Sequence, residues 1–193
     1  MIQETARQQE YYGLVSEEVY APHHYYSKTV KRDEYSFNIV LSKHNDCSDY
    51  FFEPIKQVID NLGGLGKLEN LDLITTIPSH ARGRVSPTLS SLGVKLSTYL
   101  NVPFENIIER IKTDESKCKP ACEKFDAVHN SMKITKKIGG IKKILLLDDV
   151  KVTGVTLLEA KKVLRESGVS ETICVCLGIN VSSDFFGGDN DNG

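Results

Sequence analysis

The chain has 193 residues, long enough for one domain with a full hydrophobic core, and 40% of them are apolar. Its 24 basic and 26 acidic residues leave a formal net charge of −2, so the total charge offers no reason to bind a polyanion. Because no apolar run approaches membrane-spanning length and the N-terminus lacks a basic-then-apolar signal pattern, we expect a cytoplasmic protein with reduced cysteines and no membrane partner.

The N-terminal part of the chain, residues 1–60, predicts a β-rich or helical extension. Within it, residues 35–41 alternate between apolar and polar side chains and then become continuously apolar, which predicts a strand. That strand would pair with residues 18–20 in a hairpin or small antiparallel sheet. Apolar residues at helical spacing predict a helix over residues 50–62, which two glycines end.

Strands and helices alternate through residues 61–182, the predicted core. The expected strands are 71–78, 104–111, 131–135, 144–147 and 172–179, and the expected helices are 89–100 and 157–167. This alternation predicts an α/β fold with a mostly parallel, twisted sheet and helices on both faces. Residues 183–193 predict a flexible tail. Ligands of such sheets bind beyond the carboxyl ends of the strands, so the loops after strands carry the candidate sites.

The most informative segment is residues 144–156, ILLLDDVKVTGVT. Its apolar residues predict a buried strand that ends in Asp148 and Asp149. The Gly-containing turn then opens a helix, whose first backbone N–H groups suit an anion such as phosphate. Carboxylates beside a phosphate suit the hydroxyls of an attached sugar or a divalent metal. The segment therefore predicts a sugar-phosphate site; the simpler alternative is a strand, turn and helix with a purely structural role.

This segment resembles the motif with which type I phosphoribosyltransferases bind 5-phosphoribosyl-1-pyrophosphate (PRPP). The resemblance implies that Asp148 and Asp149 bind the ribose 2′- and 3′-hydroxyls, and that the following loop binds the 5′-phosphate. The loop residues are Lys151, Val152, Thr153, Gly154, Val155 and Thr156. Many members of the family have a second hydroxyl residue where this chain has Val152, so one side-chain hydrogen bond to phosphate is absent here.

A second candidate loop follows the strand predicted at residues 71–78. It consists of Ser79, His80, Ala81, Arg82, Gly83 and Arg84. Guanidinium groups match the oxygens of pyrophosphate, and the loop resembles in position the pyrophosphate-contacting loop of the same family. Arg82 and Arg84 are equal candidates for that contact, and His80 is a weaker one. An ordinary exposed basic loop is the alternative.

Residues 112–130 are polar and lysine-rich, without a clean period. A connection of this length is usually functional or disordered. The resemblance implies a mobile loop that closes over the sugar, in which Lys117 and Lys119 add positive charge near the departing pyrophosphate; a solvated loop is the alternative. Cys118, Cys122 and His129 are too few, and wrongly spaced, for a structural zinc site.

The resemblance as a whole implies a transferase of nucleotide metabolism, which transfers phosphoribosyl from PRPP to a nitrogen acceptor such as a nucleobase and releases pyrophosphate. Asp148, Asp149, Arg82 and Arg84 are the expected catalytic residues. Mg²⁺ is the expected cofactor, held mainly by the substrate rather than by a dedicated protein site. The N-terminal extension would supply a hood over the acceptor, and a homodimer is an accompanying expectation.

The nearest subgroup is the ComF-type phosphoribosyltransferases, which Arg110, Lys112 and Asn130 around the mobile loop resemble. Their N-terminal cysteine-rich zinc finger is missing here. Two alternatives to the enzyme therefore stay open. One is a non-catalytic PRPP or nucleotide sensor that regulates a partner protein, and the other is a ComF-like accessory protein of DNA processing with a nucleic-acid partner.

Overall fold

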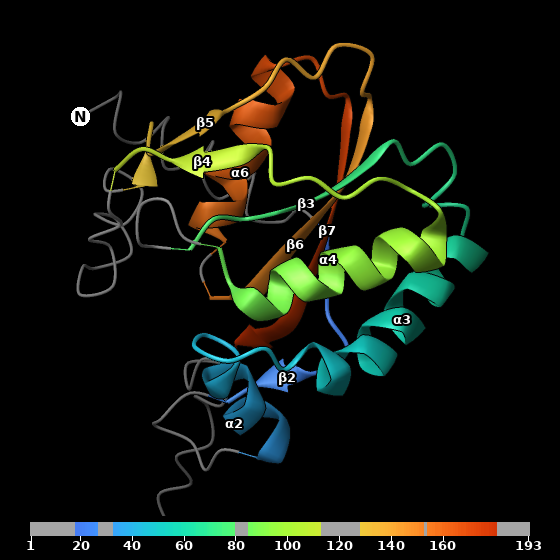
Figure 1. Ribbon diagram of the computed structural model, residues 1–193, viewed down its shortest axis with the longest axis vertical. Coiled ribbons are helices and arrows are strands. Elements are labelled where there is room, and N and C mark those ends of the chain that lie inside the picture. The colour runs from blue at the N-terminus through green and yellow to red at the C-terminus, as the bar shows by residue number, and fades with distance from the viewer. Residues whose placement is uncertain (1–17, 27–32, 80–84, 113–127, 153, 181–193) are drawn as a thin grey trace, which may run out of the picture.

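The computed structural model describes residues 18–26, 33–79, 85–112, 128–152 and 154–180. Its centre is a parallel sheet that carries helices on both faces (Figure 1). The predicted α/β class with a mostly parallel sheet is thus confirmed. Among the helices of the described residues, none combines the length and apolar character that crossing a bilayer requires.

The elements of the sheet and its helices are as follows. The strands are β1 (Val19–Tyr20), β2 (His24–Tyr25), β3 (Leu73–Thr76), β4 (Ile108–Arg110), β5 (Met132–Ile134), β6 (Lys143–Lys151) and β7 (Glu171–Asn180). The helices are α2 (Glu34–Leu41), α3 (Ser48–Gly64), α4 (Pro87–Leu100) and α6 (Val155–Glu166). The main sheet has the order β1–β7–β6–β3, with β2 also paired to β7, and all of these pairs are parallel. β4 and β5 form a separate antiparallel pair.

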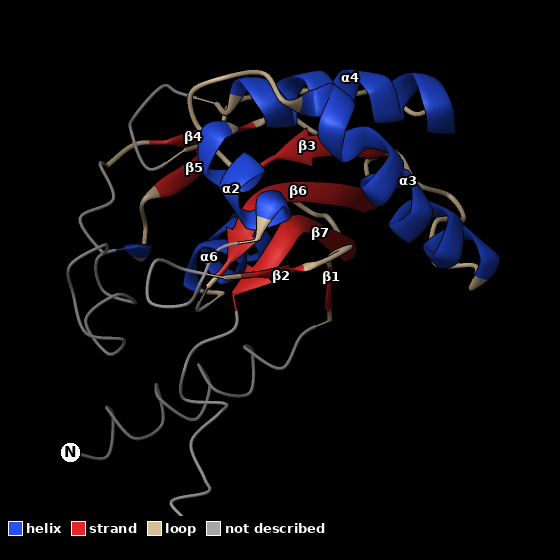
Figure 2. Cartoon of the chain, turned by 90° about the horizontal axis from the view of Figure 1, so that it is seen from below, coloured by secondary structure: helices blue, strands red, loops and turns tan. Residues whose placement is uncertain are grey.

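Strand β6 lies between β3 and β7 and is buried on both faces. Ile144 and Leu146 face the core formed with α6, whereas Leu145 and Leu147 face the core formed with α2, α3 and α4. All four side chains are at most 3% exposed. A strand covered on both sides needs apolar residues at every position, which explains the continuous run in the sequence. Figure 2 shows the strands lying between α4 and α6.

Helix α2 occupies the segment for which the sequence predicted a strand, so the expected strand at 35–41 and its antiparallel hairpin are wrong. The side chain of Asp33 caps the helix by accepting a hydrogen bond from the backbone N–H of Ser36 at 2.7 Å. Ser36 and Ile39, three residues apart, face the sheet and are fully buried, while Phe37 is 52% exposed. The alternating apolar residues therefore do not share one face.

Strands β1 and β2 extend the main sheet beyond β7. Val19 is in register with Cys174, and His24 with Ile179. Helix α2 packs closely on β7 at Gly178, because a Cβ at that position would lie only 2.9 Å from Ile39 Cδ1 of α2. The N-terminal segment is thus built directly onto the last strand of the sheet.

Helix α4 packs against Phe104 through Gly93. A Cβ at Gly93 would lie 2.2 Å from a ring carbon of Phe104, and the backbone on either side of Phe104 is hydrogen-bonded to Ile74. We expect Gly93→Ala to lower the free energy of unfolding by about 1–3 kcal/mol, because overpacking outweighs the better helix propensity of alanine. Urea unfolding measures this change.

Gly63 of α3 provides the matched control for Gly93. A Cβ at Gly63 would meet nothing within 4 Å. Gly63→Ala should therefore leave the protein as stable as the wild type or more stable. A Gly93→Ala variant that unfolds at the same urea concentration as Gly63→Ala would contradict the packing described for α4.

Candidate functional site

The candidate site lies at the carboxyl ends of β3 and β6. The chain leaving β3 stays beside β6, because the N–H of Ile77 donates to the carbonyl of Leu147 at 2.9 Å. Asp148 and Asp149 come next on β6, and Ser79 comes shortly after Ile77. The acids and the beginning of the second candidate loop are therefore neighbours at one edge of the sheet, where parallel α/β folds bind their ligands.

The two acids differ in their surroundings. Asp148 is buried, with 9% of its surface exposed, and its Oδ1 accepts from the N–H of Asp149 at 2.8 Å. The side chain of Asp149 is 33% exposed, and its Oδ1 accepts from the N–H of Val150 at 2.8 Å. Burial, and next the repulsion from Asp149, raise the pKa of Asp148 well above its ordinary value. The site therefore disfavours the ionised form of Asp148. A ligand that binds the ionised carboxylate must offset the free energy of ionising it.

Arg110 is the last residue of β4 and is 1% exposed. Its Nε donates to the carbonyl of Ser79 at 3.0 Å, and its Nη1 donates to Ser131 Oγ at 3.1 Å. Its charge lowers the pKa of Asp148, against the larger effects of burial and Asp149. The sequence marked Arg110 only as part of the subgroup resemblance. Its neighbours in β4 are Ile108 and Glu109, so no local pattern in the sequence marks its role.

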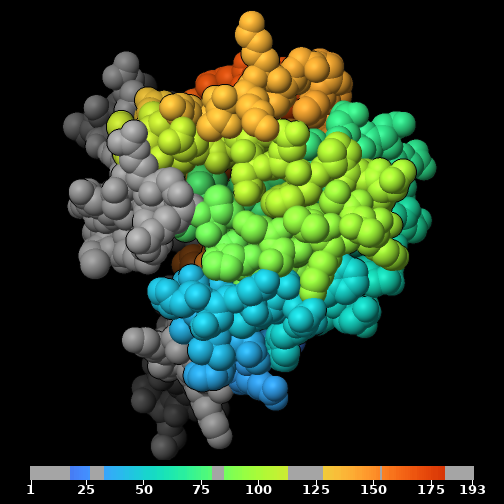
Figure 3. Space-filling model, in the orientation of Figure 1, coloured from blue at the N-terminus to red at the C-terminus, as the bar shows by residue number. Residues whose placement is uncertain are grey.

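Lys43 brings the segment after α2 to the same edge. Its Nζ lies 3.7 Å from Asp149 Oδ2, with both side chains partly exposed, so the ion pair is weak and screened by solvent. The segment is held by α4, since Thr88 Oγ1 donates to the carbonyl of Asn45 at 2.8 Å. Figure 3 shows this blue segment directly against the green start of α4. Nothing in the sequence around Lys43 predicted this position.

The predicted phosphate loop joins β6 to α6. Strand β6 extends to Lys151, past the acids, and Val152 is 58% exposed. Gly154 adopts φ +80° as the N-cap of α6, a conformation that favours glycine, and no side chain of the described residues caps this helix. Val155 and Thr156 begin the helix, where backbone N–H groups lack intrahelical partners. The turn therefore offers backbone donors to an anion beside the two acids.

Several predicted site residues fall outside the described part of the chain. They are His80, Ala81, Arg82, Gly83, Arg84, Lys117, Lys119 and Thr153. Across the described ranges, no group of three His, Cys, Asp or Glu side chains could hold a metal ion.

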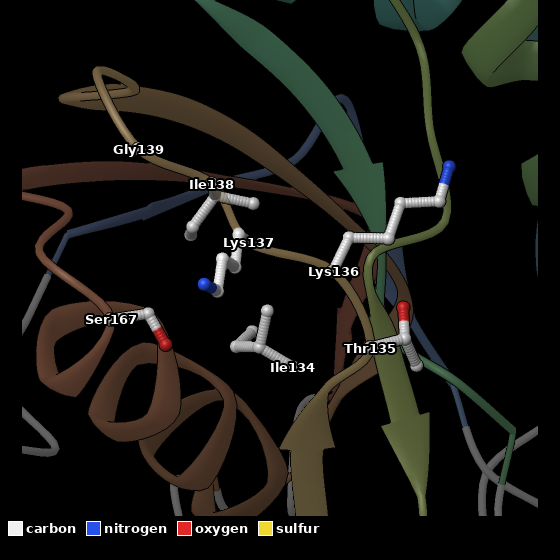
Figure 4. A pocket seen from close by; sticks show the side chains of 7 residues that line it. All are labelled: Ile134, Thr135, Lys136, Lys137, Ile138, Gly139 and Ser167. Carbon is white, nitrogen blue, oxygen red and sulfur yellow. The ribbon is translucent and has the colours of Figure 1, made fainter.

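A separate hollow of about 550 Å³ lies where β6 begins, away from the acids. It is lined by Ile134, Thr135, Lys136, Lys137, Ile138, Gly139 and Ser167 (Figure 4). The hydroxyls of Thr135 and Ser167 donate to backbone carbonyls at 3.1 and 2.9 Å, and Lys136 pairs with Glu105 at 2.9 Å. These three donors are therefore already engaged, and the carboxyl edge, with its two acids and glycine turn, remains the candidate.

No protein-family model matches the chain, and a search of curated proteins finds no significant match. The class of protein is therefore inferred from the carboxyl-edge site and from the motif that forms it.

Proposed function

We propose that this protein is a phosphoribosyltransferase of the type I kind, which transfers the phosphoribosyl group of PRPP to a nitrogen acceptor such as a nucleobase. The observation that carries the proposal is residues 144–156: a buried strand, two acids and a glycine turn that opens helix α6, all at the carboxyl edge of a parallel sheet. A sugar with a phosphate at its 5′ end matches this order of groups.

Each part of PRPP has a counterpart at this edge. The uncapped start of α6 and the turn before it suit the 5′-phosphate. Asp148 and Asp149 suit the ribose hydroxyls, because an ionised carboxylate accepts hydrogen bonds and a hydroxyl donates them, whereas an ionised phosphate does not. Arg82 and Arg84 suit the pyrophosphate, and their loop begins at Ser79, beside the acids.

The reaction forms a bond from the acceptor nitrogen to C1 of the ribose and breaks the bond from C1 to pyrophosphate, which leaves with the bonding electrons. The ring gains positive charge in the transition state, and the carboxylates of Asp148 and Asp149 favour that charge. Arg82 and Arg84 stabilise the charge that develops on the leaving group. Mg²⁺, if bound with the substrate, would supply further Lewis-acid stabilisation of the leaving group. The proton of the acceptor nitrogen is lost to solvent.

A second candidate function is a PRPP or nucleotide sensor without catalysis. It is favoured by Val152, which is exposed in the phosphate loop and offers no hydroxyl to the ligand. It is also favoured by the contact of Lys43 with Asp149, which joins the N-terminal segment to the ribose end of the site. Such a link lets ligand binding change the surface around α2 and so reach a partner. A ComF-like accessory role has only the sequence resemblance in its favour.

Pyrophosphate release separates the enzyme from the sensor. We expect the protein to release pyrophosphate from PRPP and Mg²⁺ in the presence of at least one purine or pyrimidine base, as a coupled pyrophosphate assay would measure. Reactions without a base control for hydrolysis, and the variant with both Asp148→Asn and Asp149→Asn controls for contaminating enzymes. Tight PRPP binding without release for any base would favour the sensor and contradict the enzyme.

A further inference from the structure

We propose that Arg110 is a positioning residue, which holds the start of the pyrophosphate loop against the ribose-binding acids. This inference rests on the proposed function for the ligand that the loop meets, but not for the contacts of Arg110 themselves. Arg110 does not need to touch the substrate, because it is buried and acts through Ser79 and Asp148.

The geometry gives Arg110 a fixed orientation. A guanidinium group is planar and donates in set directions, so the bonds to Ser79 and Ser131 together determine where it lies. Ser131 is itself fixed, since its carbonyl accepts from the N–H of Ile111 at 2.8 Å and its N–H donates to the carbonyl of Val128 at 3.1 Å. The β4–β5 pair therefore serves as a rigid base from which Arg110 reaches across to β3.

A purely structural role explains these contacts less well. Burying a guanidinium is costly, and an apolar residue would fill the same space at lower cost. A buried cation is favourable where it compensates a buried anion, and the carboxyl of Asp148 lies within its electrostatic reach. Arg110 thus keeps Asp148 closer to the ionised form that accepts hydrogen bonds from ribose hydroxyls.

Other titratable and charged groups also surround Asp148. Asp149 follows it on β6, and Cys176 of β7 is in register with it. Burial, and next the charge of Asp148, raise the pKa of the Cys176 thiol, so this group adds no charge at neutral pH. Lys43 faces Asp149 from the segment after α2, at 3.7 Å. Among these groups, Arg110 is the fully buried cation, and this sets its effect apart from solvent-screened Lys43.

The first test measures ligand affinity in Arg110→Lys, which keeps the charge but loses the planar pair of donors. We expect the Kd for PRPP with Mg²⁺ to rise about tenfold or more, because small displacements of positioning groups are expensive. The Kd for ribose 5-phosphate, which does not meet the pyrophosphate loop, should stay close to the wild-type value. Calorimetric titration measures both. A wild-type Kd for PRPP in this variant would overturn the inference.

The second test needs no ligand. The carboxyl carbon of Asp148, followed by carbon-13 NMR during a pH titration, should show a higher pKa in Arg110→Gln than in the wild type. Arg110→Lys should remain near the wild type. Lys133→Gln is the matched control: it removes a cation from β5, but Lys133 is exposed and pairs with Glu109 at 3.2 Å on the surface. An unchanged Asp148 titration in a folded Arg110→Gln variant would overturn the inference.

The two tests also separate this inference from the proposed function. If the wild-type protein binds no PRPP, the proposed function is wrong, and the titration of Asp148 still decides the role of Arg110. If Arg110→Gln does not fold, Ser131→Ala replaces it, because this change removes the acceptor of Nη1 and little else. That variant keeps the charge of Arg110, so a raised Kd for PRPP with an unchanged Kd for ribose 5-phosphate supports the inference, and a wild-type Kd for PRPP overturns it.

Discussion

Replacing Asp148 and Asp149 together by asparagine should abolish the rise in melting temperature that PRPP with Mg²⁺ gives the wild-type protein. A ligand present at a hundred times its Kd stabilises the folded state by about 2.7 kcal/mol. In a chain of this size that corresponds to a rise of about 5–10 °C. The doubly substituted protein loses both carboxylates that accept from the ribose, so we expect a shift of less than about 1 °C. Differential scanning fluorimetry measures it.

The same substitutions should not weaken the ligand-free protein. The pKa of Asp148 is raised in the folded state above its unfolded value, so the folded state loses stability as the pH rises from the unfolded pKa through the folded one. Removing the charge should therefore raise the free energy of unfolding at pH 7. This advantage should vanish below about pH 3.9, where the carboxyl is protonated in both states.

Asp60→Asn supplies the control for this experiment. Asp60 lies on α3 and pairs with Lys56 at 2.7 Å on the surface, away from the carboxyl edge. Its variant should keep the full shift with PRPP. The assignment of the sugar site is wrong if the variant lacking Asp148 and Asp149 is stabilised by PRPP as strongly as Asp60→Asn.

Replacing Arg82 and Arg84 together by alanine should weaken PRPP binding at least about tenfold, and leave ribose 5-phosphate binding nearly unchanged. A hydrogen bond to a charged group contributes about 1.5–3 kcal/mol, and 1.4 kcal/mol is a factor of ten in Kd. Ribose 5-phosphate keeps its contacts with the acids and the start of α6. Titration calorimetry with both ligands gives the two ratios.

The contrast between the two ligands identifies what the arginines do. Equal weakening of both would mean that the loop acts through general electrostatics or supports the fold, and would contradict a pyrophosphate contact. Arg165→Ala removes a cation from the exposed last turn of α6 and is the control for net charge. It should change neither affinity by more than about twofold, because distant exposed charges are screened.

The core strands and the helices of the main sheet could be predicted from sequence because burial leaves a strong pattern. β6 is apolar at four consecutive buried positions, and the leucines of α4 recur at helical spacing. Residues 35–41 misled the prediction because Tyr35, Phe37, Ile39 and Leu41 alternate like a strand. The N-cap from Asp33 and the packing of Ile39 on the sheet favour a helix instead. A pattern of alternating apolar residues reveals neither of them.

The local part of the site could be predicted in the same way, and its tertiary part could not. Asp148, Asp149 and Gly154 lie so close in the sequence that one strand and one turn bring them together. Arg110 and Lys43 reach the same edge from distant segments, through β4 and through the segment after α2. Their positions depend on how the sheet is assembled, which no local spacing encodes.

The order of the strands also affects how the chain folds as it is synthesised. β3 pairs with β6, and β1 pairs with β7. Leu73 therefore cannot pair until Ile144 has been synthesised, and Val19 cannot pair until Cys174 has been synthesised. None of these parallel pairs forms on the ribosome before β6 has emerged. Until then the apolar sides of α3 and α4 have no sheet to cover them, which exposes the nascent chain to chaperones and to aggregation. The long-range pairing that brings the acids and Arg110 to one edge thus delays assembly of the site until β6 has been synthesised.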